Sequence, residues 1–354
     1  MRKYHQIISV IFILIESSAC EQILEVKYPE RKAMITLNCI LTSGDSILME
    51  VKSSQSYPPQ SDSTLFIKNA SIALYEDQKL IGELKYREAD PGIYPLKKKF
   101  QYFNYYLTDR IMAESGHSYS VNVSAPGFTD ISANTYIPFP VPIISVDTSS
   151  VVINYSNSQL KSLECLINFQ DPEGKNSYML SVDRIGRYKM TYYENNVLIS
   201  KTNTVRYFIP FFCEDPDVVY FRISPGSPGT IPLEKDEKDS WMSEVFITDD
   251  SFKNKVYSLR ILIPYMLLND NAYPQNPGEK FTMRKLNIRL YSINDEFYKY
   301  ARSWYTQVYK KNDMFSEPVG VYNNINNGAG IFSGKSVSVD SSVVVRIYYN
   351  PSLK

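Results

Sequence analysis

The chain has 354 residues and a balanced charge, with 38 Lys and Arg against 38 Asp and Glu. No basic excess is present to attract nucleic acid or an anionic surface, so we expect no nucleic-acid partner. Only two histidines occur, His5 and His117, and this number excludes zinc sites built on several histidines.

The first residues have the layout of a secretory signal peptide. A basic start precedes an apolar stretch over 7–15, and small residues over 17–19 precede Cys20. The stretch is far shorter than the ~20 residues that span a bilayer, so we predict a cleaved signal over 1–19 and no transmembrane anchor. The cysteine after small residues resembles a bacterial lipobox, although Ser17 stands where an aliphatic residue is usual. We predict lipidation of Cys20; the alternative is cleavage nearby, with Cys20 an ordinary residue.

Half-buried strands are the first elements that we predict after the signal. Apolar residues occupy every second position in AMITLNCIL, SILMEVKSS, SIALYEDQKLIGELKY and SYSVNVSAPG, and turn residues close each segment. This spacing predicts an immunoglobulin-like or transthyretin-like β-sandwich over 20–140. We expect an extended linker at its end, because Pro138, Pro140 and Pro142 cannot donate to a strand ladder.

Strand patterns resume after the linker, in LECLINFQDPEG, SYMLSVDRIG, YKMTYYENNVLIS, VYSLRILIP, KLNIRLYSI and, as a closing strand, VSVDSSVVVRIYYN. One amphipathic helix interrupts them. Asn294 is a good N-cap, so we predict the helix over 295–311. The apolar side chains on one face of this helix are Phe297, Ala301, Trp304 and Val308. The fold class is therefore mostly β, with a larger β-rich domain over 143–354 whose sheet this helix covers.

Asn and Gly concentrate in FSEPVGVYNNINNGAGIFSG, residues 315–334, which we interpret as the path from the helix to the last strand. Glycine adopts positive φ without steric cost. We expect Gly328 and Gly330 to serve backbone geometry, with Ile331 and Phe332 holding the segment in the core. Replacing both glycines by Val is then expected to lower stability.

Three cysteines remain beyond Cys20, and an odd number in an oxidising compartment permits one disulfide at most. The pair that we favour is Cys165 with Cys213, provided that both fall in one domain. The alternative is that all three, including Cys39, are buried thiols packed as small hydrophobic groups.

Residue types that carry chemistry are sparse. A Ser/His/Asp or Cys/His system needs His117, which stands at a turn entering a strand, so we expect no catalytic role for it. Glu244, Asp249 and Asp250 offer a carboxylate pair for hydrolysis, but we expect them to cap a turn. A calcium site over 269–279 lacks a known loop spacing, and a solvated loop is the expected alternative. We predict no metal, no cofactor and no enzymatic activity.

Aromatic residues are abundant, with 29 Tyr, 17 Phe and 2 Trp. They suit either contact surfaces for a ligand or partner, or half-buried strand faces, where Tyr is a common residue. Trp304 lies on the apolar face of the helix and is expected in the core. We therefore select Trp241 and Tyr273, in long polar loops of the second half, as the exposed contacts.

The block from Leu286 to Gly334 resembles the signature of DUF4249, a family of Bacteroidota lipoproteins. Its members show a strand, an aromatic helix, a PFSEPV turn and an NI.NG.GIF motif before a closing strand. Met314 replaces the usual proline, and the agreeing residues are Phe315, Ser316, Glu317, Pro318, Asn324, Ile325, Asn327, Gly328, Gly330, Ile331 and Phe332. NASIALYEDQKLIGEL and GHSYSVNVSAPGF are consistent with the same family.

The resemblance implies a lipid-anchored outer-membrane protein at the cell surface. Genes of the family tend to lie beside TonB-dependent receptors, which implies a non-enzymatic accessory or ligand-binding partner of such a receptor in nutrient uptake. The family has no established reaction and offers no catalytic residues. Two other functions stay open: a structural or assembly component of an outer-membrane complex, and a carboxylate-dependent hydrolase.

Overall fold

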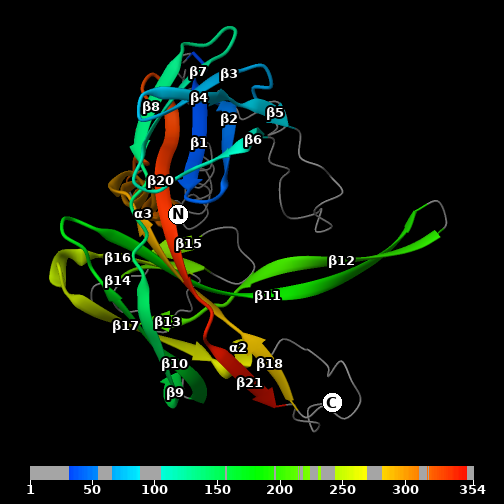
Figure 1. Ribbon diagram of the computed structural model, residues 1–354, viewed down its shortest axis with the longest axis vertical. Helices are drawn as coiled ribbons and strands as arrows, with labels where there is room; N and C mark the ends of the chain where they lie inside the picture. Colours follow the sequence, from blue (N-terminus) through cyan, green and yellow to red (C-terminus); the bar gives the residue numbers. More distant parts are fainter. Residues whose placement is uncertain are drawn as a thin grey trace, which may run out of the picture.

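The computed structural model describes residues 32–54, 66–87, 105–155, 158–194, 197–213, 215, 218–223, 230–232, 244–268, 281–310, 317 and 319–348. This part of the chain is mostly β, as the alternating patterns predict. Two layered units share one long sheet (Figure 1), and strand order along that sheet is β15-β14-β16-β11-β19-β20-β1-β2-β6-β5.

The N-terminal half forms a β-sandwich, in agreement with the predicted fold. Its strands are β1 (Ile35–Thr42), β2 (Ser46–Ser53), β3 (Ser71–Glu76), β4 (Lys79–Glu83), β5 (Lys85–Arg87), β6 (Tyr105–Met112), β7 (Ser118–Ser124) and β8 (Ile131–Tyr136). The sheet β4-β3-β7-β8 faces the β1, β2, β6 and β5 end of the long sheet. Alternate residues of β1 are buried in the shared core, namely Ile35, Leu37, Cys39 and Leu41.

The C-terminal half places a second four-stranded sheet, β13-β17-β10-β9, against the other end of the long sheet. Its elements are β9 (Ile143–Tyr155), β10 (Ser158–Gln170), β11 (Ser177–Glu194), β12 (Val197–Phe208), β13 (Phe212–Cys213), β14 (Val218–Ile223), β15 (Thr230–Pro232), β16 (Glu244–Thr248), η2 (Asp249–Ser251), β17 (Val256–Pro264), α2 (Tyr265–Leu268), β18 (Phe281–Lys285), β19 (Asn287–Ile293), α3 (Asp295–Lys310), β20 (Ala329–Asp340) and β21 (Val344–Tyr348). The strands β18 and β21 form a separate ribbon.

Helix α3 covers one face of the long sheet, as predicted, and the sheet β13-β17-β10-β9 covers the other face. Its N-terminus is capped by Asn294, whose Oδ1 accepts a hydrogen bond from the backbone N–H of Phe297 at 3.0 Å. Phe297, Ala301 and Tyr305 are buried against β11, β16 and β19, and Trp304 is partly buried beside them. The C-terminal half therefore has three layers, with the long sheet in the middle.

Strand β20 joins the two halves. Its first part, Ala329 to Lys335, pairs in parallel with Thr36 to Thr42 of β1, and its second part pairs antiparallel with β19. The glycine-rich segment thus enters a strand at residue 329, earlier than expected, and Phe332 is buried in the N-terminal core. The predicted single closing strand is in fact two, because residues 341–343 separate β20 from β21.

Candidate functional site

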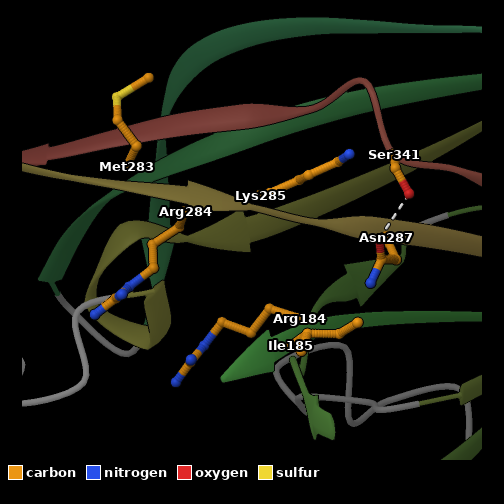
Figure 2. A pocket seen from close by; sticks show the side chains of 7 residues that line it. All are labelled: Arg184, Ile185, Met283, Arg284, Lys285, Asn287 and Ser341. Atoms are coloured by element: carbon orange, nitrogen blue, oxygen red, sulfur yellow. Dashed lines mark hydrogen bonds between the residues drawn. The ribbon is translucent and has the colours of Figure 1, made fainter. Parts of the chain in front are cut away.

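A cavity of about 510 Å³ lies at the base of the β11–β12 hairpin (Figure 2). The residues that line it come from β11, β18, β19 and the segment between β20 and β21: Arg184, Ile185, Met283, Arg284, Lys285, Asn287 and Ser341. Three of these seven residues are cationic and none is acidic. The cavity lies in the size range of small-molecule sites, which usually combine apolar walls with a few polar groups.

Arg184 and Arg284 line the cavity because each stands at the end of a row of core-facing residues. On β11 the row is Tyr178, Leu180, Val182 and Arg184, and along β19 and β18 it is Leu290, Ile288, Leu286 and Arg284. The register pairs Val182 with Ile288, so the two rows run side by side. Each of the two apolar rows thus ends in an arginine, and the two arginines lie in the same region.

Burial and the charge of Arg284 both act on Arg184. The pKa of Arg184 is lowered, first by burial and then by the positive charge of Arg284, while Tyr207 opposes the shift. The guanidinium of Arg184 lies 4.5 Å from the centroid of the Tyr207 ring. In Figure 2 the guanidinium ends of both arginines point in the same direction, and the Lys285 amine points toward Ser341 instead.

The polar residues of the lining are engaged with one another. Ser341 Oγ donates to Asn287 Oδ1 at 2.7 Å, and Asn287 Nδ2 donates to Asp183 Oδ1 at 2.8 Å. Asp183 is fully buried and also accepts a hydrogen bond from Arg289 Nε, while Arg206 Nε lies 3.7 Å from its Oδ2. The negative charge of Asp183, the neighbour of Arg184 in sequence, is therefore already balanced by Arg289 and Arg206.

Above the cavity, the hairpin of β11 and β12 extends away from the layered body as a two-stranded arm (Figure 1). Its pairing runs from Asp183 with Phe208 to Glu194 with Val197. Among the described strands, β12 pairs with β11 alone. The predicted strand segment YKMTYYENNVLIS covers the end of β11 and the start of β12, so the sequence patterns did not predict β12 as a separate strand. They also gave no indication that the hairpin leaves the sheet.

None of the residues selected from the sequence that the structure describes lines this cavity. Cys20, Trp241, Tyr273, the signal segment 1–19 and the calcium candidate over 269–279 lie outside the described residues. Their proposed roles stay predictions.

The disulfide that we favoured between Cys165 and Cys213 is not formed. Both residues are buried, and both pair with Ile261 of β17, Cys165 from β10 on one side and Cys213 from β13 on the other. Strands lie ≈ 4.8 Å apart, so two residues separated by a whole strand are roughly 10 Å apart, beyond the ~7 Å limit for a disulfide. The alternative of buried, separate cysteines holds here.

The other residues considered for chemistry have structural roles. His117 Nδ1 lies 2.6 Å from Asp77 Oδ2 at the end of a hairpin turn. Asp249 Oδ2 accepts a hydrogen bond from the backbone N–H of Asn176 at 2.7 Å, and Asp250 Oδ2 accepts one from Thr248 Oγ1 at 3.0 Å. Asp249 and Asp250 occupy the first turn of η2, as predicted, but Glu244 lies in β16 and not at a turn, so that part of the prediction is wrong.

Within the described ranges, no group of three or more His, Cys, Asp and Glu is arranged to hold a metal ion. Nor does that part of the chain contain a helix long and apolar enough to cross a membrane.

Comparison with known proteins gives one match. The family model described as "Domain of unknown function (DUF4249)" matches residues 21–341. No curated protein and no solved structure matches the chain.

Proposed function

Because the chain belongs to the DUF4249 family, we propose that it is an outer-membrane lipoprotein that serves a TonB-dependent receptor as a non-enzymatic accessory or ligand-binding partner in nutrient uptake. The signal-like start and Cys20 supply the anchor, and an acylated cysteine with several chains holds a protein firmly to a membrane. The receptor is inferred from the gene neighbourhood that the family implies.

The arm formed by β11 and β12 is the observation that carries the proposal. A two-stranded hairpin without further support is marginally stable in water. Beyond Asp183 the described part of β11 pairs with β12 alone, so the arm presents two strand edges to its surroundings. Strand edges bind partner proteins by adding a strand. A protein partner that covers the arm would stabilise it, which fits an accessory of a larger complex better than a stand-alone enzyme.

The test is a pull-down from outer membranes with the lipid-anchored protein in gentle detergent. The arm is shortened by replacing residues 188–203 with Asn-Gly, so that Arg187 and Thr204, which pair in the native register, flank a two-residue turn. The matched control is Ile144→Thr on β9, a change of an exposed apolar residue elsewhere. A second variant, Trp241→Ala with Tyr273→Ala, tests the contacts predicted from the sequence.

We expect the wild type and the Ile144→Thr control to recover a β-barrel receptor, and the shortened arm to lose it while keeping the same melting temperature. Recovery of another outer-membrane complex without such a receptor would favour the structural or assembly role. Absence of any β-barrel partner of the wild type would contradict the transporter proposal.

Anchoring is tested separately. Globomycin, which blocks lipoprotein signal cleavage, and the Cys20→Ala substitution are both expected to change processing and release the protein from the membrane fraction. Unchanged processing and fractionation in both cases would show that Cys20 is not the anchor.

A further inference from the structure

We propose that the cavity at the base of the arm binds a small organic anion, which presents a phosphate or carboxylate group to the guanidinium groups of Arg184 and Arg284. This site includes Arg184 and Ile185 at the base of the arm, and it does not depend on the receptor partnership. The cavity, its cationic lining, the burial of Arg184 and the buried Nε atom of Arg284 carry the inference.

The first argument is the energetic cost of placing the buried Arg184 beside the partly buried Arg284. Arg184 is 6% exposed, and it lies close enough to Arg284 for the two charges to repel one another. The Nε atom of Arg284 is buried and has no hydrogen-bond partner within the described residues. Removing a charged donor from water without a partner is unfavourable, so the described residues leave the Arg284 Nε poorly satisfied.

The second argument is charge complementarity. Arginine presents a planar fork of donors that matches phosphate and carboxylate oxygens. Asp183, the acidic neighbour of Arg184 in sequence, is held by Arg289 and Asn287. An external oxyanion would reduce the repulsion between Arg184 and Arg284 and give the Arg284 Nε an acceptor.

The third argument concerns the rest of the ligand. The cavity is much larger than a single phosphate needs, and Ile185 and Met283 line it with exposed side chains, 62% and 50% accessible respectively. Such apolar residues suit the hydrocarbon part of a small molecule. The Lys285 amine, which points toward Ser341, offers a third cation for another acidic group on the same ligand.

The experiment measures thermal unfolding of the purified full-length protein in detergent, in chloride, inorganic phosphate, acetate and citrate at matched ionic strength. The variants are Arg284→Gln and Arg284→Lys, and the control is Arg302→Gln, which removes the same charge from an exposed position of α3. Calorimetric titration with phosphate and citrate then gives the dissociation constants.

We expect phosphate or citrate to raise the melting temperature of the wild type and of Arg302→Gln above the value in chloride. Arg284→Gln should weaken binding by about tenfold or more, because it removes a charge-assisted hydrogen-bond donor, and Arg284→Lys should weaken it less. In chloride, Arg284→Gln should melt no lower than the wild type, because a repulsion is removed.

A larger rise of the melting temperature in phosphate would show that the ligand carries a phosphate group. A larger rise in citrate would show that it carries a carboxylate. The proposal is overturned if no oxyanion shifts the wild type, or if the wild type and Arg284→Gln respond equally. It is also overturned if Arg284→Gln melts well below the wild type in chloride and Arg284→Lys retains the full response, since Arg284 is then a structural cation.

Discussion

Gly330 lies against the main chain of Leu37: a Cβ atom on Gly330 would be 2.0 Å from the Leu37 carbonyl oxygen. The two residues are partners in the parallel pairing of β20 with β1, and Gly330 has a φ of 118°. Only glycine adopts this backbone region readily. The prediction that glycine serves backbone geometry here is confirmed, and it applies to the strand that joins both halves of the fold.

We expect Gly330→Ala to lower the free energy of unfolding by more than about 3 kcal/mol, because backbone strain and a main-chain clash add together. Gly44→Ala is the matched control: Gly44 has a φ of 82° but nothing within 4 Å of the added Cβ. It should cost about 1–2 kcal/mol from strain alone. Gly320→Ala, with neither constraint, should be close to neutral. Urea unfolding measures all three; equal losses for Gly330 and Gly44 would contradict the close-contact argument.

Asn294 links the start of α3 to the N-terminal sandwich. Besides capping the helix, its Nδ2 donates to Thr135 Oγ1 at 2.8 Å and to the Tyr136 carbonyl oxygen at 2.9 Å. Asn294→Ala should cost about 2–4 kcal/mol, from the lost cap and two hydrogen bonds, one buried and one partly buried. Asn294→Ser keeps a good capping residue and should cost about half as much. Chemical denaturation compares the two, and identical losses would show that the cap contributes little.

Local patterns predicted part of the elements of this fold, among them β1 and α3, because burial on one face leaves a period in the sequence. The alternation of β1 and the cap at Asn294 are read from neighbouring residues. The partner of β20 is not local: Gly330 pairs with Leu37, far away in the chain, and a strand's own sequence does not state which strand lies beside it. For this reason the early start of β20, and its place between the two halves, could not be predicted.

The cavity was missed for a related reason. The alternation alone places Arg184 after Val182 and Arg284 before Leu286, each at the end of a core-facing row. This was a usable indication of two unusual cations, of which Arg184 is buried and Arg284 partly buried. Their proximity depends on the pairing of β11 with β19, which is known only from the structure. Trp241 and Tyr273 were selected from loop length and residue type, which carry no information on which loops meet.

The cysteine arrangement predicts that no disulfide forms even under oxidising conditions. Alkylation of the unfolded protein without prior reduction should modify Cys39, Cys165 and Cys213 alike, and a reducing agent should leave the melting temperature unchanged. In the folded state alkylation should be slow, because burial raises the pKa of Cys165 to about 12 and leaves little reactive thiolate. Mass spectrometry of peptides is the readout; a Cys165–Cys213 linked peptide before reduction would contradict the register argument.

The contact between His117 and Asp77 predicts a pH dependence of known sign. Hydrogen bonding to Asp77 raises the pKa of His117 above its ordinary value, whereas the Ser118 backbone N–H, followed by His117, lowers the pKa of Asp77. The histidine contribution to stability is complete below the unfolded-state pKa of about 6.5 and is lost as pH rises through the higher folded-state value. The aspartate contribution is present above its unfolded-state pKa and is lost on acidification through its lowered one.

His117 is the one histidine that remains once the segment before Cys20 is removed, so its ring resonance is readily assigned by NMR. We expect a titration midpoint above 6.5 in the wild type, and a return toward that value in Asp77→Asn, which keeps an acceptor for the Ser118 N–H. The stability difference between the two proteins should be largest at mildly acidic pH and shrink as pH rises through the His117 midpoint. Glu114→Gln is the control, because its carboxylate lies 3.9 Å from His117 Nε2 and is well exposed, so the midpoint should move little. A wild-type midpoint at or below 6.5 would show that the Asp77 hydrogen bond does not hold the proton in solution.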